Sequence, residues 1–101
     1  MNRISLTITN EIATLSGDLV RQTVDEISTQ QLKNFLKQKS AIINLAAVDR
    51  VDTAGLAWLL SQIQLAQANA CQLCFRHLPS SLIKLSALSS VDKFLPVHPS
   101  S

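Results

Sequence analysis

The residues whose types and spacing most clearly suggest a functional site form one short run, Asp52-Thr53-Ala54-Gly55, at the start of a helical pattern. An Asp or Thr at a helix start accepts hydrogen bonds from backbone N–H groups that have no partner inside the helix. The aligned peptide dipoles place roughly half a positive charge there, which favours a carboxylate or a phosphate. Gly55 costs on the order of 1 kcal/mol in a first helical turn, so it indicates a close approach to the backbone. The run predicts an exposed Thr53 hydroxyl beside a bare backbone surface, with a plain capping role for Thr53 as the alternative.

The cysteines and histidines do not form a recognisable catalytic or metal-binding pattern. Cys71 and Cys74 form a Cys-x-x-Cys run followed by His77, but residues three apart on a strand point to opposite faces. We interpret both cysteines as packing residues, since free Cys behaves as a small hydrophobic side chain. No G-x-G-x-x-G run, P-loop or pair of carboxylates suited to acid–base chemistry is present. The sequence predicts no catalytic residue, no metal and no cofactor. A ligand-binding or enzymatic domain would need a convergent polar pocket, and we expect none.

Size and composition indicate one folded domain over residues 1–101, because the chain has 101 residues of which 47% are hydrophobic. The net charge is only +2 and no Tyr is present, which argues against a nucleic-acid partner. The first residues alternate polar and apolar, unlike a signal peptide, and no apolar run approaches the roughly 20 residues that span a bilayer. We expect a cytoplasmic protein that reaches a membrane only indirectly, through a partner.

Apolar spacing predicts the element order β-β-α-β-α-β-α, with a possible last short strand at residues 91–97. Residues 4–9 and 12–16 form a hairpin, and Gly17-Asp18 ends its second strand. Thr23 to Glu26 has the form of a capping box and predicts that an amphipathic helix begins at Thr23. A strand follows at 41–46, then a charged loop at 49–52, the helix after Asp52, a strand at 70–77 and a helix opened by Pro79.

Helices that alternate with strands after a hairpin require parallel pairing through right-handed crossovers. The predicted fold class is therefore α/β (α+β mixed). It consists of a mixed sheet of four to five strands packed with three to four helices.

The helix that begins at Thr53 carries an apolar stripe from Leu56 that is expected to face the core. Trp58 and Leu65 fall on the opposite side of this stripe by spacing. Trp58 is a singly exposed aromatic, part of a second packing surface under a loop, or an anchor for a partner. We favour the anchor, because Trp is enriched in interface hot spots. The predicted partner-binding residues are Thr53 with Asp52, Ala54, Gly55, Trp58, Gln62 and Leu65.

Along nearly its whole length the chain resembles the STAS domain family. The resemblance rests on Leu15-Ser16-Gly17-Asp18-Leu19, on residues 43–48, and above all on Val51-Asp52-Thr53-Ala54-Gly55-Leu56. In the anti-sigma-factor antagonists of that family the last motif reads Asp-Ser-Ser-Gly or Asp-Ser-Thr-Gly, and a partner kinase phosphorylates its first hydroxyl. Thr53 holds that position here, and Ala54 replaces the second hydroxyl. The run is more similar to the MlaB-type STAS subunit of the Mla phospholipid transporter.

This resemblance implies a non-catalytic cytoplasmic subunit, peripheral to the inner membrane, that binds and regulates the ATPase of an ABC transporter. Such a transporter traffics phospholipids and maintains outer-membrane lipid asymmetry. The alternative that the family implies is an anti-sigma-factor antagonist switched by phosphorylation at Thr53. Genes for an ATPase and a permease beside this one would favour transport, whereas a kinase and a sigma factor would favour signalling.

Overall fold

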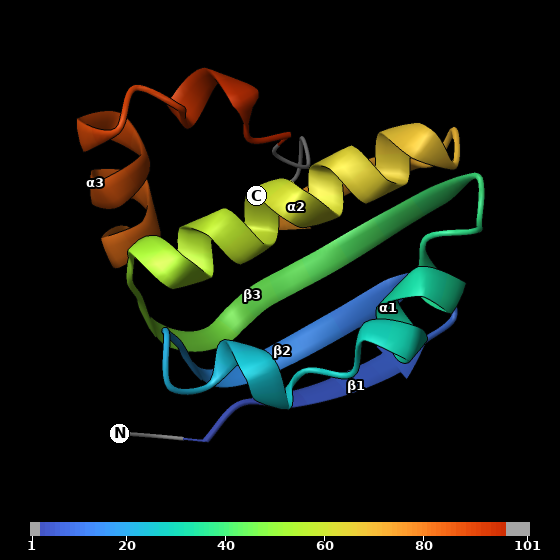
Figure 1. Cartoon of the computed structure of the whole chain (residues 1–101), viewed down its shortest axis with the longest axis horizontal. Helices are drawn as coiled ribbons and strands as arrows, with labels where there is room; N and C mark the ends of the chain where they lie inside the picture. Colours follow the sequence, from blue (N-terminus) through green and yellow to red (C-terminus); the bar gives the residue numbers. More distant parts are fainter. Residues whose placement is uncertain (1–2, 97–101) are drawn as a thin grey trace.

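The computed structural model describes residues 3–96, which form one mixed sheet with helices α1 and α2 packed over one of its faces (Figure 1). The strands are β1 (Ser5–Thr9), β2 (Ile12–Leu19), β3 (Ser40–Val51) and β4 (Gln72–Arg76), in the sheet order β1-β2-β3-β4. β1 pairs with β2 antiparallel, whereas the β2–β3 and β3–β4 pairs are parallel. The predicted hairpin followed by parallel crossovers is confirmed.

The helices are α1 (Thr29–Phe35), α2 (Thr53–Ala68) and α3 (Ser80–Leu88), with two short 3-10 helices, η1 (Val24–Glu26) and η2 (Asp92–Phe94). The predicted fold class is therefore confirmed. The last short strand does not form over residues 91–96, where η2 takes its place, and Val97 lies outside the described residues. A single backbone bond links this segment to the sheet, from the Phe75 N–H to the Pro96 carbonyl at 2.6 Å. Proline has no N–H to extend a ladder there.

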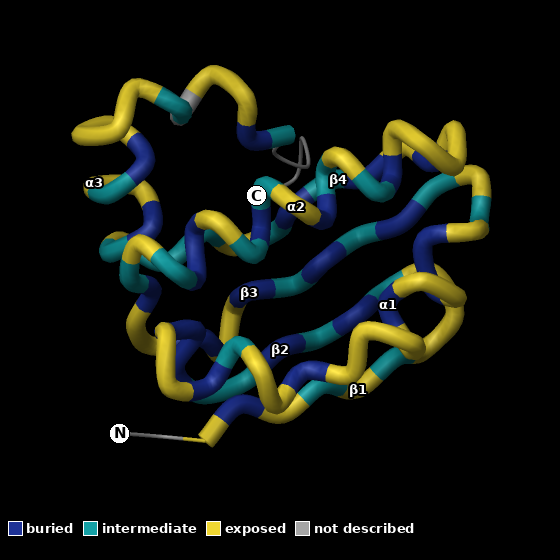
Figure 2. The backbone as a smooth tube through the Cα atoms, in the orientation of Figure 1, coloured by how far each residue is buried: buried dark blue, intermediate teal, exposed yellow. Residues whose placement is uncertain are grey.

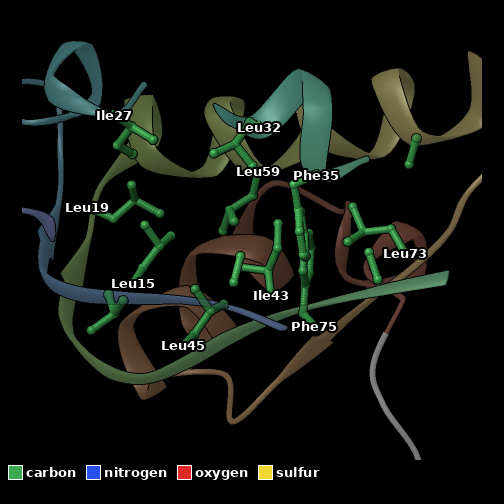
Figure 3. Close-up of a cluster of buried hydrophobic side chains, with 14 of the residues drawn as sticks. Leu15, Leu19, Ile27, Leu32, Phe35, Ile43, Leu45, Leu59, Leu73 and Phe75 are labelled. Atoms are coloured by element: carbon green, nitrogen blue, oxygen red, sulfur yellow. The ribbon is translucent and has the colours of Figure 1, made fainter. Parts of the chain in front are cut away.

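The core lies between the helices and one face of the sheet, because alternate residues of a strand point to opposite faces. Leu15, Ile43 and Phe75 come from three neighbouring strands and are fully buried beneath Leu59 of α2 (Figure 3). The opposite face carries the intervening polar side chains, such as Thr14 and the Asn44 that pairs with it across β2 and β3. Figure 2 shows the central strand β3 alternating between intermediate and buried residues over its first half.

The strand β2 continues past Gly17-Asp18, where the sequence predicted its end. Gly17 has φ +104°, and a Cβ there would meet the backbone carbonyl of Arg3. The pairing with β3 shifts register between Gly17 and Asp18 and then continues to Leu19. The extra residue at this shift is Asp49 of β3, because Gly17 pairs with Val48 and Asp18 with Arg50. Gly17 therefore lies opposite a bulge in β3 and does not end β2.

The strand β3 is longer than predicted and includes most of the supposed charged loop at 49–52. Its last residues pair with the end of β2, Asp18 with Arg50 and Leu19 with Val51. Val48 and Val51 are buried. Asp49 and Arg50 are both exposed between the two buried valines, because Asp49 is the extra residue at the register shift between Val48 and Arg50. The charged residues therefore lie at an irregularity within the strand and not in a loop.

The capping box predicted at Thr23 is wrong, because the Thr23 side chain is used inside the domain. Its hydroxyl donates to the Asp18 carbonyl at 2.6 Å and accepts from the Val20 N–H at 3.0 Å. The segment that follows forms only the short η1 helix, and α1 begins at Thr29. Ser28 caps α1 by accepting a hydrogen bond from the Gln31 N–H at 3.2 Å. The predicted opening of the third helix is confirmed, since Pro79 is the N-cap of α3.

Candidate functional site

Asp52 fixes the start of α2 through both of its carboxylate oxygens. Oδ1 accepts a hydrogen bond from the Gly55 N–H at 2.9 Å, which makes Asp52 the N-cap of α2. Oδ2 accepts from the Arg21 N–H at 3.0 Å, in the loop after β2. Burial by itself raises the pKa of Asp52, but hydrogen bonds from backbone N–H groups, that of Arg21 first, outweigh it and hold the pKa below its ordinary value. The carboxylate is ionised at neutral pH and ties the helix start to the end of β2.

The close approach at Gly55 comes from the domain itself. Gly55 is buried, and a Cβ there would collide with the Leu19 carbonyl at the end of β2 and lie 3.0 Å from Val51 Cγ1. The same carbonyl accepts a hydrogen bond from the Asp52 N–H at 3.3 Å. The prediction of a bare backbone surface at Gly55 is therefore wrong. Glycine is needed because α2 starts directly against β2, and Gly55 offers no surface to a partner.

The corner where α2 begins consists of Asp52, Thr53, Ala54 and Gly55. Thr53 is its most exposed residue. It is the first residue of α2 and is exposed, whereas Asp52 and Ala54 on either side are only partly accessible. Because Asp52 supplies the cap, the first turn of α2 does not depend on the Thr53 hydroxyl. The plain capping role is thereby removed. The predicted exposed hydroxyl is present, on a helix start that is held by the sheet.

Trp58 and Leu65 lie on one flank of α2, and the prediction that they point away from the core is wrong. Both are half-buried and pack against the core cluster. Helical spacing puts Asn69 on the same flank, and its side chain donates to the Leu36 carbonyl, next to the end of α1, at 3.3 Å. The misplacement arose because α2 is apolar on several sides, so one stripe chosen from Leu56 did not define the buried face.

Gln62 is buried, with 8% of its surface accessible, so it is not part of an open partner surface in the free domain. Its Nε2 donates to the Trp58 carbonyl at 3.3 Å and lies at the same distance from Ser61 Oγ. Within residues 3–96 its Oε1 is buried and meets no hydrogen-bond donor. The roles predicted for Trp58, Gln62 and Leu65 in partner binding stay predictions.

The cysteines do not converge with other ligands. Cys71 is buried and Cys74 is half-buried, and both are free thiols. Burial raises the pKa of the Cys71 thiol, so it is a poor nucleophile. Among the described residues no group of three or more His, Cys, Asp or Glu could hold a metal ion. Both observations agree with a packing role for the cysteines.

A hollow of about 860 Å3 lies on the open face of the sheet at the hairpin end. Several polar side chains line it, so the expectation that the domain would show no polar pocket needs correction. Its amides are engaged with the backbone, however. Gln38 Nε2 donates to the Phe35 carbonyl at 3.0 Å and to the Asn10 carbonyl at 3.2 Å, and Asn44 Oδ1 accepts from the Ala46 N–H at 3.0 Å. The hollow offers no cluster of acid, base and nucleophile.

Sequence reasoning missed a second concave region, which lies beside α2 itself. A cavity of about 270 Å3 separates the outer flank of α2 from the segment that contains η2. Its walls are Leu60 and Ile63 of α2 with Val91 and Phe94. The signal in the sequence was the apolar run after residue 90, which was assigned to a strand.

Within residues 3–96, none of the helices combines the length and the apolar character that a membrane span requires.

The comparisons with known proteins agree on the fold. An anti-sigma-factor antagonist STAS protein from Planctomyces limnophilus superposes with a TM-score of 0.70 at 12% identity, covering 97% of this chain and 90% of that one. Unphosphorylated SpoIIAA gives 0.67 at 17% identity, covering 94% and 87% of the two chains. Phosphorylated SpoIIAA from Bacillus gives 0.64 at 17%, covering 94% and 90%.

The sequence itself assigns the family more directly than these distant structural matches. A sequence model described as the STAS domain matches residues 3–101. The match includes the corner formed by Asp52, Thr53 and Gly55 and the strands that hold it. The chain therefore belongs to the STAS domain family.

Proposed function

We propose that this STAS domain is a non-catalytic subunit that binds and regulates the ATPase of a phospholipid-trafficking ABC transporter. The observation that carries the proposal is the exposed Thr53 on a helix start fixed by Asp52. A surface that is rigid before binding loses little conformational freedom when a partner docks on it. The domain thus works by contact with another protein and not by chemistry of its own.

The chemistry of the corner supports a partner that approaches closely. Thr53 is uncharged, Ala54 is small, and the Asp52 carboxylate is already satisfied by backbone N–H groups. A neutral hydroxyl beside a small side chain can be desolvated at modest cost when it forms a hydrogen bond across an interface. The Asp-Thr-Ala-Gly-Leu-Ala run also resembles that of STAS subunits of phospholipid transporters more than that of the antagonists.

An anti-sigma-factor antagonist switched by phosphate on Thr53 is the second candidate. The structural likeness to SpoIIAA, solved in unphosphorylated and phosphorylated forms, favours it as far as the fold is concerned. The exposed position of Thr53 at a helix N-terminus is also accessible to a kinase. Ala54 in place of the second hydroxyl distinguishes this chain from the antagonist motif. Stoichiometric phosphate on Thr53 after incubation with a serine kinase encoded beside this chain, measured by mass spectrometry, would favour this second function.

The experiment for the first function is co-purification of this chain with the ATPase subunit of a phospholipid-trafficking ABC transporter from the same organism. Thr53→Asp places a charge in the contact, and we expect the complex to be lost while the melting temperature stays within roughly 4 °C of the wild type. Thr29→Asp is the matched control, because Thr29 is also an exposed threonine at the first position of a helix, α1, directly after its N-cap Ser28. It lies on another helix and outside the proposed contact, so it should retain binding. Full association of the Thr53→Asp variant would overturn the proposal.

A further inference from the structure

One stripe of α2 leads from Thr53 to the cavity beside η2. Residues four, seven and eleven positions after Thr53 lie on the same side of a helix, and these are Ala57, Leu60 and Gln64. Thr53, Ala57 and Gln64 are exposed and Leu60 is half-buried. Leu60 and Gln64 also line the cavity of about 270 Å3. The stripe is therefore an open path along α2 that begins at the corner and ends at a hollow.

Phe94 stands at the end of this path. Phe94 is 68% exposed, whereas the next residue, Leu95, is buried. It lines the cavity of about 270 Å3 and also a neighbouring one of about 320 Å3, and the two cavities share Ile63 and Gln67 of α2. Figure 1 shows the η2 segment running back above α2 after α3. Because Phe94 lies between two cavities, only part of its side chain packs against the rest of the domain.

Among the residues that the structure describes, those that line the two cavities carry no charged side chain. The smaller cavity is lined by Leu60, Ile63, Gln64, Gln67, Val91 and Phe94. The other adds Ala66, Cys71, Gln72, Leu73 and Pro96 to the shared residues. A charged group placed there would lose its hydration with no opposite charge to compensate. The surface therefore accepts an uncharged, apolar segment, and the glutamine amides at its rim can bond the backbone of that segment.

We propose that the footprint of the partner extends from Thr53 along Ala57, Leu60 and Gln64 onto Phe94, where an uncharged apolar segment of the ATPase subunit fills the two hollows. This inference rests on the proposed function and defines the chemistry of the partner at that same surface. Continuity along one helical stripe is the reason for assigning the same occupant to the corner and to the hollows. Exposed apolar patches bounded by polar groups are typical of protein contact sites, and buried aromatic anchors carry much of the affinity there.

The test is the dissociation constant for the ATPase subunit of a phospholipid-trafficking ABC transporter from the same organism, measured by titration with wild type and variants. Phe94→Ala is expected to weaken binding by roughly tenfold or more, because it removes the anchor. The melting temperature should stay within roughly 4 °C of the wild type, since the ring is mostly exposed. Leu88→Ala is the matched control, since Leu88 is 85% exposed on α3 and does not line the cavities. It should bind as the wild type does.

A second variant keeps the inference testable if Phe94→Ala alters the local fold. Gln64→Glu changes one amide to a carboxylate at an exposed position of α2, and we expect it to weaken binding through the charge placed in the neutral stripe. If Thr53→Asp abolishes binding while both variants bind normally, the proposed function stands and the extended footprint is wrong. If Thr53→Asp also binds normally, the proposed function itself fails. If Phe94→Ala instead abolishes self-association in light scattering and leaves ATPase binding intact, the patch joins two copies of this chain and the inference is overturned.

Discussion

Gly55 is the position where two physical effects oppose each other most clearly, so Gly55→Ala tests the description of the corner. Alanine in a helix is more stable than glycine by about 1 kcal/mol, which would stabilise the variant. Against this, the new Cβ would collide with the Leu19 carbonyl and lie 3.0 Å from Val51 Cγ1. A backbone carbonyl within a strand cannot move aside as a flexible side chain can.

The steric effect is expected to exceed the gain in helix propensity. Overpacking by one methyl group typically costs about 1–3 kcal/mol. Displacing Leu19 also weakens the bond from the Asp52 N–H to its carbonyl, which at 3.3 Å is already long and contributes about 1 kcal/mol at most. After the propensity gain of about 1 kcal/mol is subtracted, the loss in free energy of unfolding expected for Gly55→Ala is at most about 3 kcal/mol and is centred near about 1.5 kcal/mol. The melting temperature should then fall by roughly 5–20 °C.

The assay is urea unfolding followed by fluorescence of Trp58, which is the single Trp of the chain and packs against the core. Ala57→Gly serves as the control in the reverse direction, because Ala57 is exposed on α2 and its methyl group meets no strand. That variant should lose about 0.5–1 kcal/mol. If Gly55→Ala is as stable as the wild type or more stable, α2 is not held against β2 and the rigid corner is refuted.

Two further variants probe the polar side chains of Asp52 and Gln62. Asp52 has a lowered pKa in the folded chain, so it stabilises the fold at pH above its ordinary value of 3.8, and that contribution is lost as the pH falls through the lower folded value. Asp52→Asn should therefore lose less stability than the wild type between about pH 6 and pH 3, and equal losses in urea unfolding at the two pH values would contradict this. Gln62→Leu replaces a buried amide whose Oε1 has no donor within the described residues. It should raise the free energy of unfolding by roughly 1 kcal/mol, and a loss of that size would show that the amide is satisfied.

Apolar spacing was sufficient to predict the order of the elements, because each one buries a regular set of side chains. Leu15, Ile43 and Phe75 follow the alternation of a strand, and the sheet placed them as expected. Local polar signals were less reliable. Thr23 has the sequence of a helix cap, but its hydroxyl bonds the Asp18 carbonyl, a partner that only the folded chain brings near. Arg50 was predicted to lie in a loop because of its charge, but it pairs with Asp18 of β2 within the sheet.

The candidate site was predicted in part for the same reason. The exposure of Thr53 and the cap at Asp52 follow from contacts within a few residues, which a sequence displays. The reason for Gly55 lies in Leu19, which is distant in the chain, so the sequence indicated that something comes close without saying what. The side of α2 that carries Trp58 depends on where α1 packs, and no spacing rule contains that information.

The same contacts bear on whether the corner acts as a fixed surface or as a phosphate switch. The two N–H groups that would most readily receive an anion, those of Gly55 and Arg21, are already bonded to the Asp52 carboxylate. A phosphate on Thr53 would add roughly 1.5 to 2 negative charges next to that ionised carboxylate, and the two anions would repel each other. It would therefore gain less from the helix dipole than a phosphate at a helix start without a carboxylate cap. Modification of Thr53 would act chiefly by expelling a neutral partner from the stripe that Thr53 begins, because the charge would lose its hydration in that contact. The geometry thus favours a mechanism in which phosphate on Thr53 controls whether a partner is bound. It does not favour one in which phosphate changes the conformation of the domain.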